Sequence, residues 1–169
     1  MNTCAFLILI ILIISDPPFK QSSFRKKIEI NNPDLMEHEK DPIWLKDKGN
    51  RLYKAGDFVS ATHAYTLAIK ITPNNPNLYL NRAASYLNSN MLHKAISDCQ
   101  NSIEILTPPV KDNLLQRAKA FSRRGAAFTK LGMFEQALDD TKHAFELTRD
   151  EKIGKDLENI RGLMENRQG

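Results

Sequence analysis

Five polar residues, distributed over three helix-like segments, could together bind a negatively charged group. Lys46 and Asn50 are four residues apart, as are Lys119 and Arg123, and side chains at this spacing lie on one face of a helix. Asn81 lies in the matching stretch of the segment between them. Lysine supplies mobile ammonium donors, arginine a planar fork of N–H groups, and asparagine an amide that donates and accepts. The set suits a peptide that ends in two adjacent carboxylates, its α-carboxylate and an aspartate side chain.

A helix-pair repeat of 34 residues must position these side chains, because small and large residues recur with that period. The recurring positions are Gly49, Ala61, Tyr65, Ala68 and Pro73 in residues 42–75; Ala83, Ala95, Cys99, Ser102 and Pro108 in 76–109; and Gly125, Ala137, Thr141, Ala144 and Arg149 in 118–151. This period is typical of tetratricopeptide repeats, in which the first helix of each pair lines the concave surface. The five polar residues would therefore face one groove.

Close crossing of the two helices within each repeat requires a small residue at the contact. The expected contacts are Gly49 with Ala61, Ala83 with Ala95, and Gly125 with Ala137. Apolar residues such as Leu45, Leu52 and Val59 recur at intervals of three and four, as an amphipathic helix pair requires. Turns are expected at Gly56–Asp57, Asn90 and Gly132.

Two segments interrupt or close the repeats. The third repeat begins eight residues late, and Thr107 to Leu114 form the expected insert, with Pro108 and Pro109 ending the preceding helix. Residues 152–166 carry spaced apolar side chains and are expected to form a capping helix. The predicted fold is all-α: three tetratricopeptide helix-turn-helix repeats in a right-handed α-solenoid with a C-terminal capping helix, spanning residues 41–167.

Residues 1–40 show no such period and are expected to be a flexible leader. They include an apolar run at residues 5–14, which is shorter than the ~20 residues that span a bilayer. No Lys or Arg precedes this run, as a secretory signal would require. Targeting or membrane association through this run is the less favoured interpretation, and a membrane-associated receptor remains an alternative.

The charge distribution favours an acidic ligand in the repeat region. The chain has a formal net charge of +4, and residues 1–40 hold five basic and five acidic side chains, so the excess lies from residue 41 onward. A basic, nucleic-acid-binding helical repeat is a second alternative, but aromatic residues interleaved with the basic ones for base stacking are missing. Outside the five-residue set, Lys48, Arg51, Arg82 and Arg124 are expected to be flanking or structural.

No pattern in the sequence supports catalysis, a metal site or a cofactor. The four histidines are dispersed, and the two cysteines cannot supply a four-ligand zinc site. Cys99 stands at a repeat position that requires a small side chain, so a core thiol is expected rather than a nucleophile. Gly-rich phosphate loops, nucleophile elbows and metalloprotease motifs do not occur. We therefore expect a binding protein and no enzyme.

Three segments, LKDKGNRLYKAGDF, LYLNRAASY and KAFSRRGAAF, resemble the carboxylate-clamp class of tetratricopeptide co-chaperones. That class holds the C-terminal Glu-Glu-Val-Asp tails of the ninety- and seventy-kilodalton heat-shock chaperones. Carried over by position, the resemblance implies a clamp in which all five residues match by type: Lys46, Asn50, Asn81, Lys119 and Arg123.

A closer resemblance, over about residues 41–165, is to the C-terminal half of the dynein axonemal assembly factor family known as the dyslexia-susceptibility candidate. It rests on IWLKDKGN, LYLNRAASYLNSNMLHKAISDC and the insert TPPVKDN. The resemblance implies a cytoplasmic adaptor, also found in the nucleus, for preassembly of dynein arms of motile cilia, with dynein chains among its partners. That family carries an N-terminal domain similar to the co-chaperone p-twenty-three, for which residues 1–40 are too short. A short isoform, a truncated gene model or a divergent paralogue would each explain this.

Overall fold

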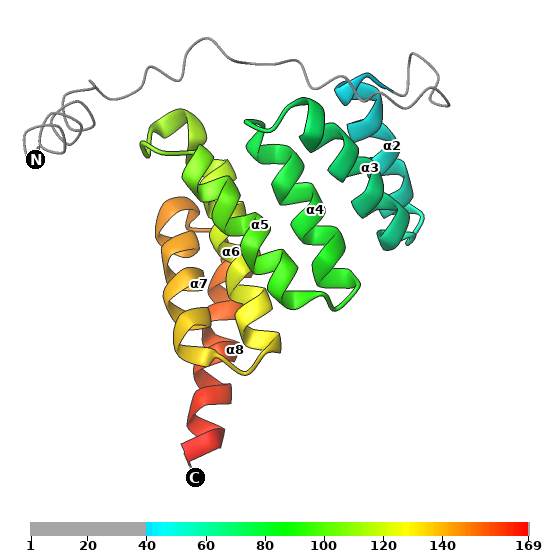
Figure 1. The fold of residues 1–169 in the computed structure, drawn as a ribbon. Helices are drawn as coiled ribbons and strands as arrows, with labels where there is room; N and C mark the ends of the chain where they lie inside the picture. Colours follow the sequence, from blue (N-terminus) through cyan, green and yellow to red (C-terminus); the bar gives the residue numbers. More distant parts are fainter. Residues whose placement is uncertain (1–39, 169) are drawn as a thin grey trace, which may run out of the picture.

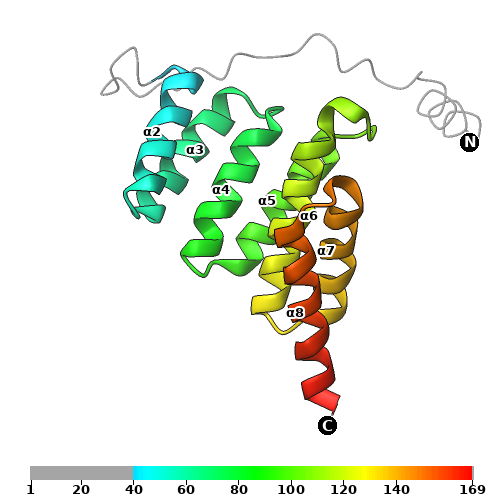
Figure 2. The same cartoon turned by 180° about the vertical axis from the view of Figure 1, so that it is seen from behind.

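The computed structural model describes residues 40–168, which fold into a row of antiparallel helices. From α2 to α7 the helices follow one another across the molecule in chain order, and α8 lies beside α7 (Figures 1 and 2). Their bounds are α2 Pro42–Lys54, α3 Phe58–Ile71, α4 Pro76–Asn88, α5 Leu92–Ile105, α6 Leu114–Lys130, α7 Phe134–Thr148 and α8 Glu151–Gln168. The predicted all-α solenoid of three helix pairs and a closing helix is confirmed.

The predicted leader, with its apolar run at residues 5–14, lies outside the described residues. Within residues 40–168, none of the helices has the length and apolar character needed to cross a membrane. The last helix, α8, packs on α7 and extends beyond it toward the C-terminus (Figure 1). It buries Leu157 and Ile160, as expected of a helix that covers the open end of the repeats.

The first helices of repeats one and two begin in the same way. Asp41 and Asn75 precede α2 and α4, and their side chains accept hydrogen bonds from backbone N–H groups of the first helical turn. Pro42 and Pro76 follow at the first helical position, where the missing N–H needs no partner. The start of each of these two concave-side helices is therefore determined by the local sequence.

The turns inside the repeats occur where the sequence predicts them. Gly56, Asn90 and Gly132 have positive φ angles of 82°, 57° and 73°. Glycine and asparagine tolerate this left-handed conformation better than other residues do. Each turn reverses the chain so that the second helix of the repeat returns along the first.

The helix crossings agree only in part with the predicted contacts. A Cβ on Gly125 would lie 2.6 Å from the Oγ1 of Thr141 and 3.2 Å from the backbone oxygen of Ala137, so the predicted approach of Gly125 to Ala137 is confirmed. A Cβ on Gly49 would instead lie 2.6 Å from the ring of Tyr65. The tyrosine ring therefore lies directly against the glycine, and the predicted contact of Gly49 with Ala61 stays a prediction.

Two glycine substitutions test the close helix crossing at Gly125. Gly125→Ala should lower the free energy of unfolding by about 1–3 kcal/mol, because the new methyl group meets backbone as well as side-chain atoms. Gly162→Ala is the matched control in α8, where a Cβ would meet nothing within 4 Å. It should raise stability by about 0.5–1 kcal/mol through helix propensity. Urea unfolding followed by circular dichroism measures both, and a neutral Gly125→Ala would contradict the close crossing.

The structure also differs from the sequence prediction at Val59 and Leu114. Val59, counted among the apolar core-facing residues, is 54% exposed at the start of α3. Leu114, assigned to the insert, is the first residue of α6, which follows a short 3-10 helix, η2 (Lys111–Asn113). The amide of Asn113 closes the insert by donating to the carbonyl oxygens of Leu106 and Pro108 at 2.8 and 3.0 Å. This fixed loop lets α6 begin one helical turn before the predicted repeat boundary.

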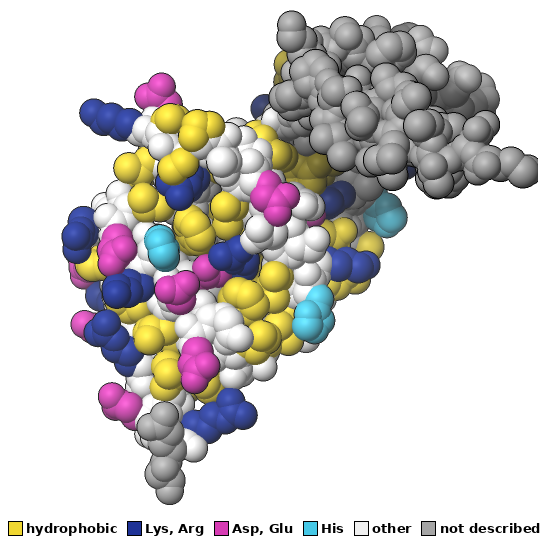
Figure 3. Space-filling view, turned by 60° about the vertical axis from the view of Figure 1, so that its left-hand side comes forward, with side chains coloured by type: hydrophobic (Ala, Val, Ile, Leu, Met, Phe, Trp, Pro, Cys, Tyr) yellow, Lys and Arg dark blue, Asp and Glu magenta, His cyan; other side chains and the backbone are white. Residues whose placement is uncertain are grey.

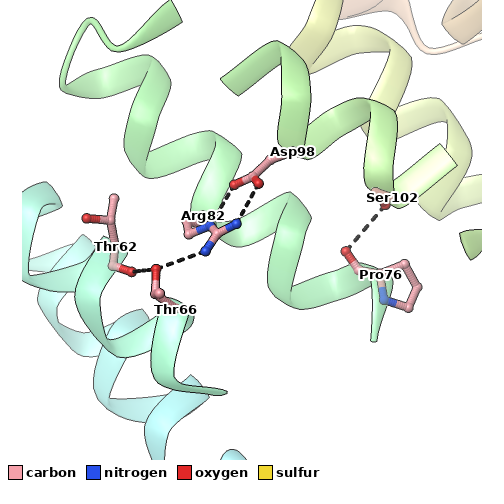
Figure 4. Close-up of polar contacts among 6 residues, drawn as sticks. All are labelled: Thr62, Thr66, Pro76, Arg82, Asp98 and Ser102. Carbon is pink, nitrogen blue, oxygen red and sulfur yellow. Dashed lines mark hydrogen bonds and ion pairs between the residues drawn. The ribbon is translucent and has the colours of Figure 1, made fainter. Parts of the chain in front are cut away.

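Arg82 joins three helices, which confirms that it is structural (Figure 4). Its Nε and Nη2 donate to the two carboxylate oxygens of Asp98 on α5 at 2.8 and 2.7 Å. Its Nη1 donates to the Oγ1 of Thr66 on α3, in the preceding repeat, at 2.9 Å. The side chain of Asp98 is only 4% exposed, so this bidentate pair neutralises a buried carboxylate while linking neighbouring repeats.

The third repeat contains the same arrangement around Arg124. Its Nε and Nη2 bind both oxygens of Asp140 at 2.7 Å, and its Nη1 donates to the side-chain oxygen of Gln100 in the preceding repeat. The equivalent positions of the first repeat hold Lys48 and Ala64, which cannot form such a pair. The bridge therefore connects the second repeat to the first and the third to the second.

Cys99 is a fully buried core residue, as predicted, and it makes the fold sensitive to alkali. Burial raises the pKa of its thiol from 9.0 to about 12. The unfolded chain would release this proton above pH 9 whereas the folded chain would keep it, so the free energy of unfolding falls as pH rises from about 9 to 12. Between pH 7.5 and 10.5, the free energy of unfolding of wild type should fall by about 2 kcal/mol more than that of Cys99→Ala, as measured by urea unfolding under reducing conditions. An equal fall in the free energy of unfolding of both proteins would contradict the proposed effect of the buried Cys99 thiol.

Candidate functional site

A pocket of about 190 Å³ lies among the first helices of the three repeats. α4 packs against both α2 and α6, and α3 contributes one side chain. The pocket contains three of the five predicted site residues. Its lining residues are Asn50, Tyr53, Lys54, Tyr65, Asn81, Ala84 and Arg123.

The side-chain amide of Asn50 is held by two donors from other helices. The hydroxyl of Tyr65 on α3 donates to its Oδ1 at 2.8 Å, and the Nδ2 of Asn81 on α4 donates to the same oxygen at 3.2 Å. A carbonyl oxygen has two lone pairs, and both are used here. The N–H groups of Asn50 are consequently left as donors toward the pocket.

Arg123 contributes a half-buried positive charge to the same pocket. Its Nη1 donates to the backbone carbonyl oxygen of Leu80 at 2.7 Å. Within residues 40–168, no Asp or Glu side chain forms an ion pair with it. Burial lowers the pKa of the guanidinium, although arginine still remains charged at neutral pH. An anionic ligand would supply the missing counter-charge.

The two tyrosines of the pocket add hydroxyl groups with fixed partners. Burial raises the pKa of Tyr65 to about 12, so its donor proton is retained throughout the physiological pH range. The hydroxyl of Tyr53 accepts a hydrogen bond from the Nδ2 of Asn88 at 3.0 Å, which leaves its own proton available. Free donors therefore predominate in the pocket, and an acceptor such as a carboxylate fits it.

Lys46 and Lys119 lie outside the pocket lining. Each is one helical turn before a lining residue, Asn50 or Arg123, and therefore on the same side of its helix. The ammonium group of Lys46 lies 3.7 Å from the carboxylate of Asp47, and both side chains are substantially exposed. Lys119 is exposed and forms no hydrogen bond or ion pair with another described residue. Both lysines can reach a ligand that extends from the pocket along the helices.

Sequence reasoning missed several lining residues, of which Tyr65 is the most informative. Tyr65 occupies the repeat position held by Cys99 and Thr141 in the other two repeats. The repeat pattern therefore predicts that the residue is in the core, but it gives no indication that a hydroxyl there would contact Asn50. Lys54 is eight residues after Lys46 and four after Asn50, a spacing that continues the same helix face and could have revealed it. No group of three or more His, Cys, Asp or Glu side chains in residues 40–168 could hold a metal ion.

The comparisons with known proteins agree with this architecture. The tetratricopeptide-repeat family profile matches residues 49–90. Dynein axonemal assembly factor 4 of Rattus norvegicus is 42% identical over 150 residues, which are 86% of this chain and 36% of that protein. The Pongo pygmaeus protein of the same name is 45% identical over 133 residues, or 78% of this chain and 32% of that protein. The chain thus spans about a third of the length of these relatives.

Solved structures of tetratricopeptide domains have the same fold as this chain. The first tetratricopeptide domain of Spaghetti (RPAP3), bound to the HSP90 peptide SRMEEVD, superposes with a TM-score of 0.65 at 30% identity and covers 76% of this chain and 96% of that chain. The chain belongs to the tetratricopeptide-repeat family. Over its aligned residues, this tetratricopeptide-repeat protein is a homologue of dynein axonemal assembly factor 4.

A second solved structure shows the same domain type with another peptide. The second tetratricopeptide domain of human RPAP3, in complex with the HSP70 peptide SGPTIEEVD, has a TM-score of 0.62 at 29% identity and covers 72% of this chain and 98% of that chain. The proteins named here are assembly factors and repeat domains, and none carries the name of an enzyme. The chain is thus related to an assembly factor and to tetratricopeptide domains bound to chaperone peptides.

Proposed function

We propose that this tetratricopeptide-repeat protein is an adaptor that binds the C-terminal Glu-Glu-Val-Asp tails of ninety- and seventy-kilodalton heat-shock chaperones. The observation that carries the proposal is the half-buried guanidinium of Arg123, which has no carboxylate partner within residues 40–168 and shares its pocket with amide donors. Structural relatives at 29–30% identity are bound to peptides that end in this sequence. Binding brings chaperone and client together, and no chemical step is involved.

Two groups of site residues would bind the two carboxylates of the terminal aspartate. Asn50, Asn81 and Arg123 line the pocket and would bind one carboxylate with charge-assisted and neutral N–H donors. Lys46 and Lys119 lie one helical turn before Asn50 and Arg123, on the first and last of the three concave-side helices. They would bind the second carboxylate as mobile point charges. Because the two carboxylates of a terminal aspartate are only a few bonds apart, one short groove can hold both.

The distribution of surface charge supports a peptide ligand over a nucleic acid. Arg82 and Arg124 are engaged in ion pairs with Asp98 and Asp140, so two of the central cations are already neutralised. On the face shown in Figure 3, basic and acidic side chains are interspersed with hydrophobic ones. A nucleic-acid surface would need a continuous basic track instead.

The biological setting follows from the homologues. Because those homologues are dynein axonemal assembly factors, the bound chaperone would act on axonemal dynein chains, assembled in the cytoplasm before they enter motile cilia. Dynein chains and further assembly factors would contact surfaces outside the carboxylate pocket. We place the binding unit in residues 41–167.

Calorimetric titration of the full chain with the peptide Ser-Arg-Met-Glu-Glu-Val-Asp tests the proposal. The free-acid peptide should bind with micromolar affinity, and the same peptide amidated at its C-terminus should bind at least about tenfold more weakly, because one charge-assisted contact is lost. Lys119→Ala should also weaken the free-acid peptide. Equal affinity for both peptides, or no binding by protein that circular dichroism shows to be folded, would refute the proposal.

A further inference from the structure

The orientation of the Asn50 amide determines whether the pocket favours acceptors. With its oxygen directed at Tyr65 and Asn81, Asn50 offers two N–H donors to a ligand. If the amide rotated by half a turn, its oxygen would face the ligand instead. That arrangement would repel a carboxylate and accept an N–H from a carboxamide. Discrimination between acid and amide therefore depends on what prevents the rotation.

Tyr65 is held in the position needed to prevent this rotation. Its side chain is 2% exposed, and its ring packs so tightly against Gly49 that a Cβ there would lie 2.6 Å away. If the amide rotated, the hydroxyl could accept from its N–H group, but the proton of the hydroxyl would then have no acceptor within residues 40–168, and the Nδ2 donor of Asn81 would face a second donor. The 2.8 Å hydrogen bond is the shorter of the two that Asn50 accepts.

We propose that Tyr65 is a positioning residue that fixes the Asn50 amide and thereby makes the pocket select a terminal carboxylate over a terminal carboxamide. This inference rests on the function proposed above. Tyr65 need not touch the ligand, because it acts through Asn50.

The repeat architecture itself does not require this hydroxyl. The positions equivalent to Tyr65 hold Cys99 in the second repeat and Thr141 in the third, while those equivalent to Asn50 hold Ala84 and Ala126. The tyrosine and the asparagine therefore occur together only in the first of the three repeats. Packing against Gly49 needs the ring alone, which phenylalanine would supply equally well.

Tyr65→Phe removes the hydroxyl and retains the ring. Calorimetry with the acid and amidated forms of the Ser-Arg-Met-Glu-Glu-Val-Asp peptide should show about tenfold weaker binding of the acid, from loss of one ordered hydrogen bond, and less than twofold change for the amide. In an Asn50→Ala background, Tyr65→Phe should have no further effect. Tyr86→Phe, the same chemical change outside the pocket lining, should leave both affinities unchanged.

Two outcomes would overturn the positioning role. In the first, Tyr65→Phe leaves the ratio of the affinities for the acid and amidated peptides at its wild-type value. In the second, Tyr65→Phe weakens binding of the acid peptide equally in the wild-type and Asn50→Ala backgrounds. Either result would mean that Tyr65 acts through packing alone. Partial unfolding would reduce both affinities in proportion and so cannot mimic a change in the ratio. Wild-type protein that fails to distinguish the two peptides would instead refute the proposed function, and the inference with it.

Discussion

Arg123→Met should abolish measurable binding of an Asp-terminated peptide and leave the protein at least as stable as wild type. The guanidinium is half-buried, its Nη1 donates to the carbonyl oxygen of Leu80, and no carboxylate within residues 40–168 compensates its charge. Removing a buried charge that lacks a partner is neutral or favourable for folding when an apolar side chain of similar length replaces it. Residues that bind a ligand are often retained at the expense of stability.

The expected loss of affinity is at least about a hundredfold, because a bidentate arginine makes more than one charge-assisted hydrogen bond to a carboxylate. Calorimetry measures the affinity, and urea unfolding measures the stability. Arg124→Met is the matched control: it should reduce stability by breaking the pair with Asp140, and the fraction that remains folded should still bind. An Arg123→Met protein that binds as wild type does would remove the basis of the proposed site.

Asp98→Ala should be among the most destabilising single changes outside the apolar core, lowering the free energy of unfolding by about 3 kcal/mol. Its side chain is 4% exposed and it accepts both hydrogen bonds of the Arg82 fork, so the truncation leaves a largely buried guanidinium without a counter-charge. Because Arg82 also binds Thr66 in the preceding repeat, contact between the first two repeats should weaken as well.

The double variant Arg82→Met with Asp98→Leu tests whether the loss comes from the unpaired charge. It removes both charged groups and should recover stability to within about 1–2 kcal/mol of wild type. Glu151→Ala, which breaks the exposed pair with Lys155 on α8, should have no measurable effect and serves as the control. Asp98→Ala with wild-type stability would show that the bridge is not needed to join the repeats.

Much of the fold could be predicted because the repeat places small residues at a fixed spacing. Gly125 and Ala137 identified a real close crossing, and Gly56, Asn90 and Gly132 identified real turns, since each of these residues allows something that larger ones do not. The close contact of Gly49 with the ring of Tyr65 was not predicted, because residue spacing alone does not show which side chain of the partner helix lies nearest to a glycine. The early start of α6 depends on the hydrogen bonds of Asn113 within the insert, which no residue pattern reveals.

Less of the candidate site than of the fold could be predicted from the sequence. Helix periodicity relates Lys46 to Asn50 and Lys119 to Arg123, but it cannot show that only Asn50 and Arg123 line the pocket. The contacts that orient the site join residues far apart in the chain: Asn81 reaches Asn50 across 31 positions and Arg123 reaches Leu80 across 43. Such contacts depend on how successive repeats rotate against one another, which residue types alone do not determine.

The most direct test of the central claim is an NMR titration of the full chain with the Ser-Arg-Met-Glu-Glu-Val-Asp peptide, observing the side-chain N–H signals of Asn50, Asn81 and Arg123. All three signals should shift together and saturate at one equivalent of peptide, and the amidated peptide should leave them nearly unchanged. Shifts confined to another hollow, such as the one between Gly132 and Arg167 at α8, would contradict it.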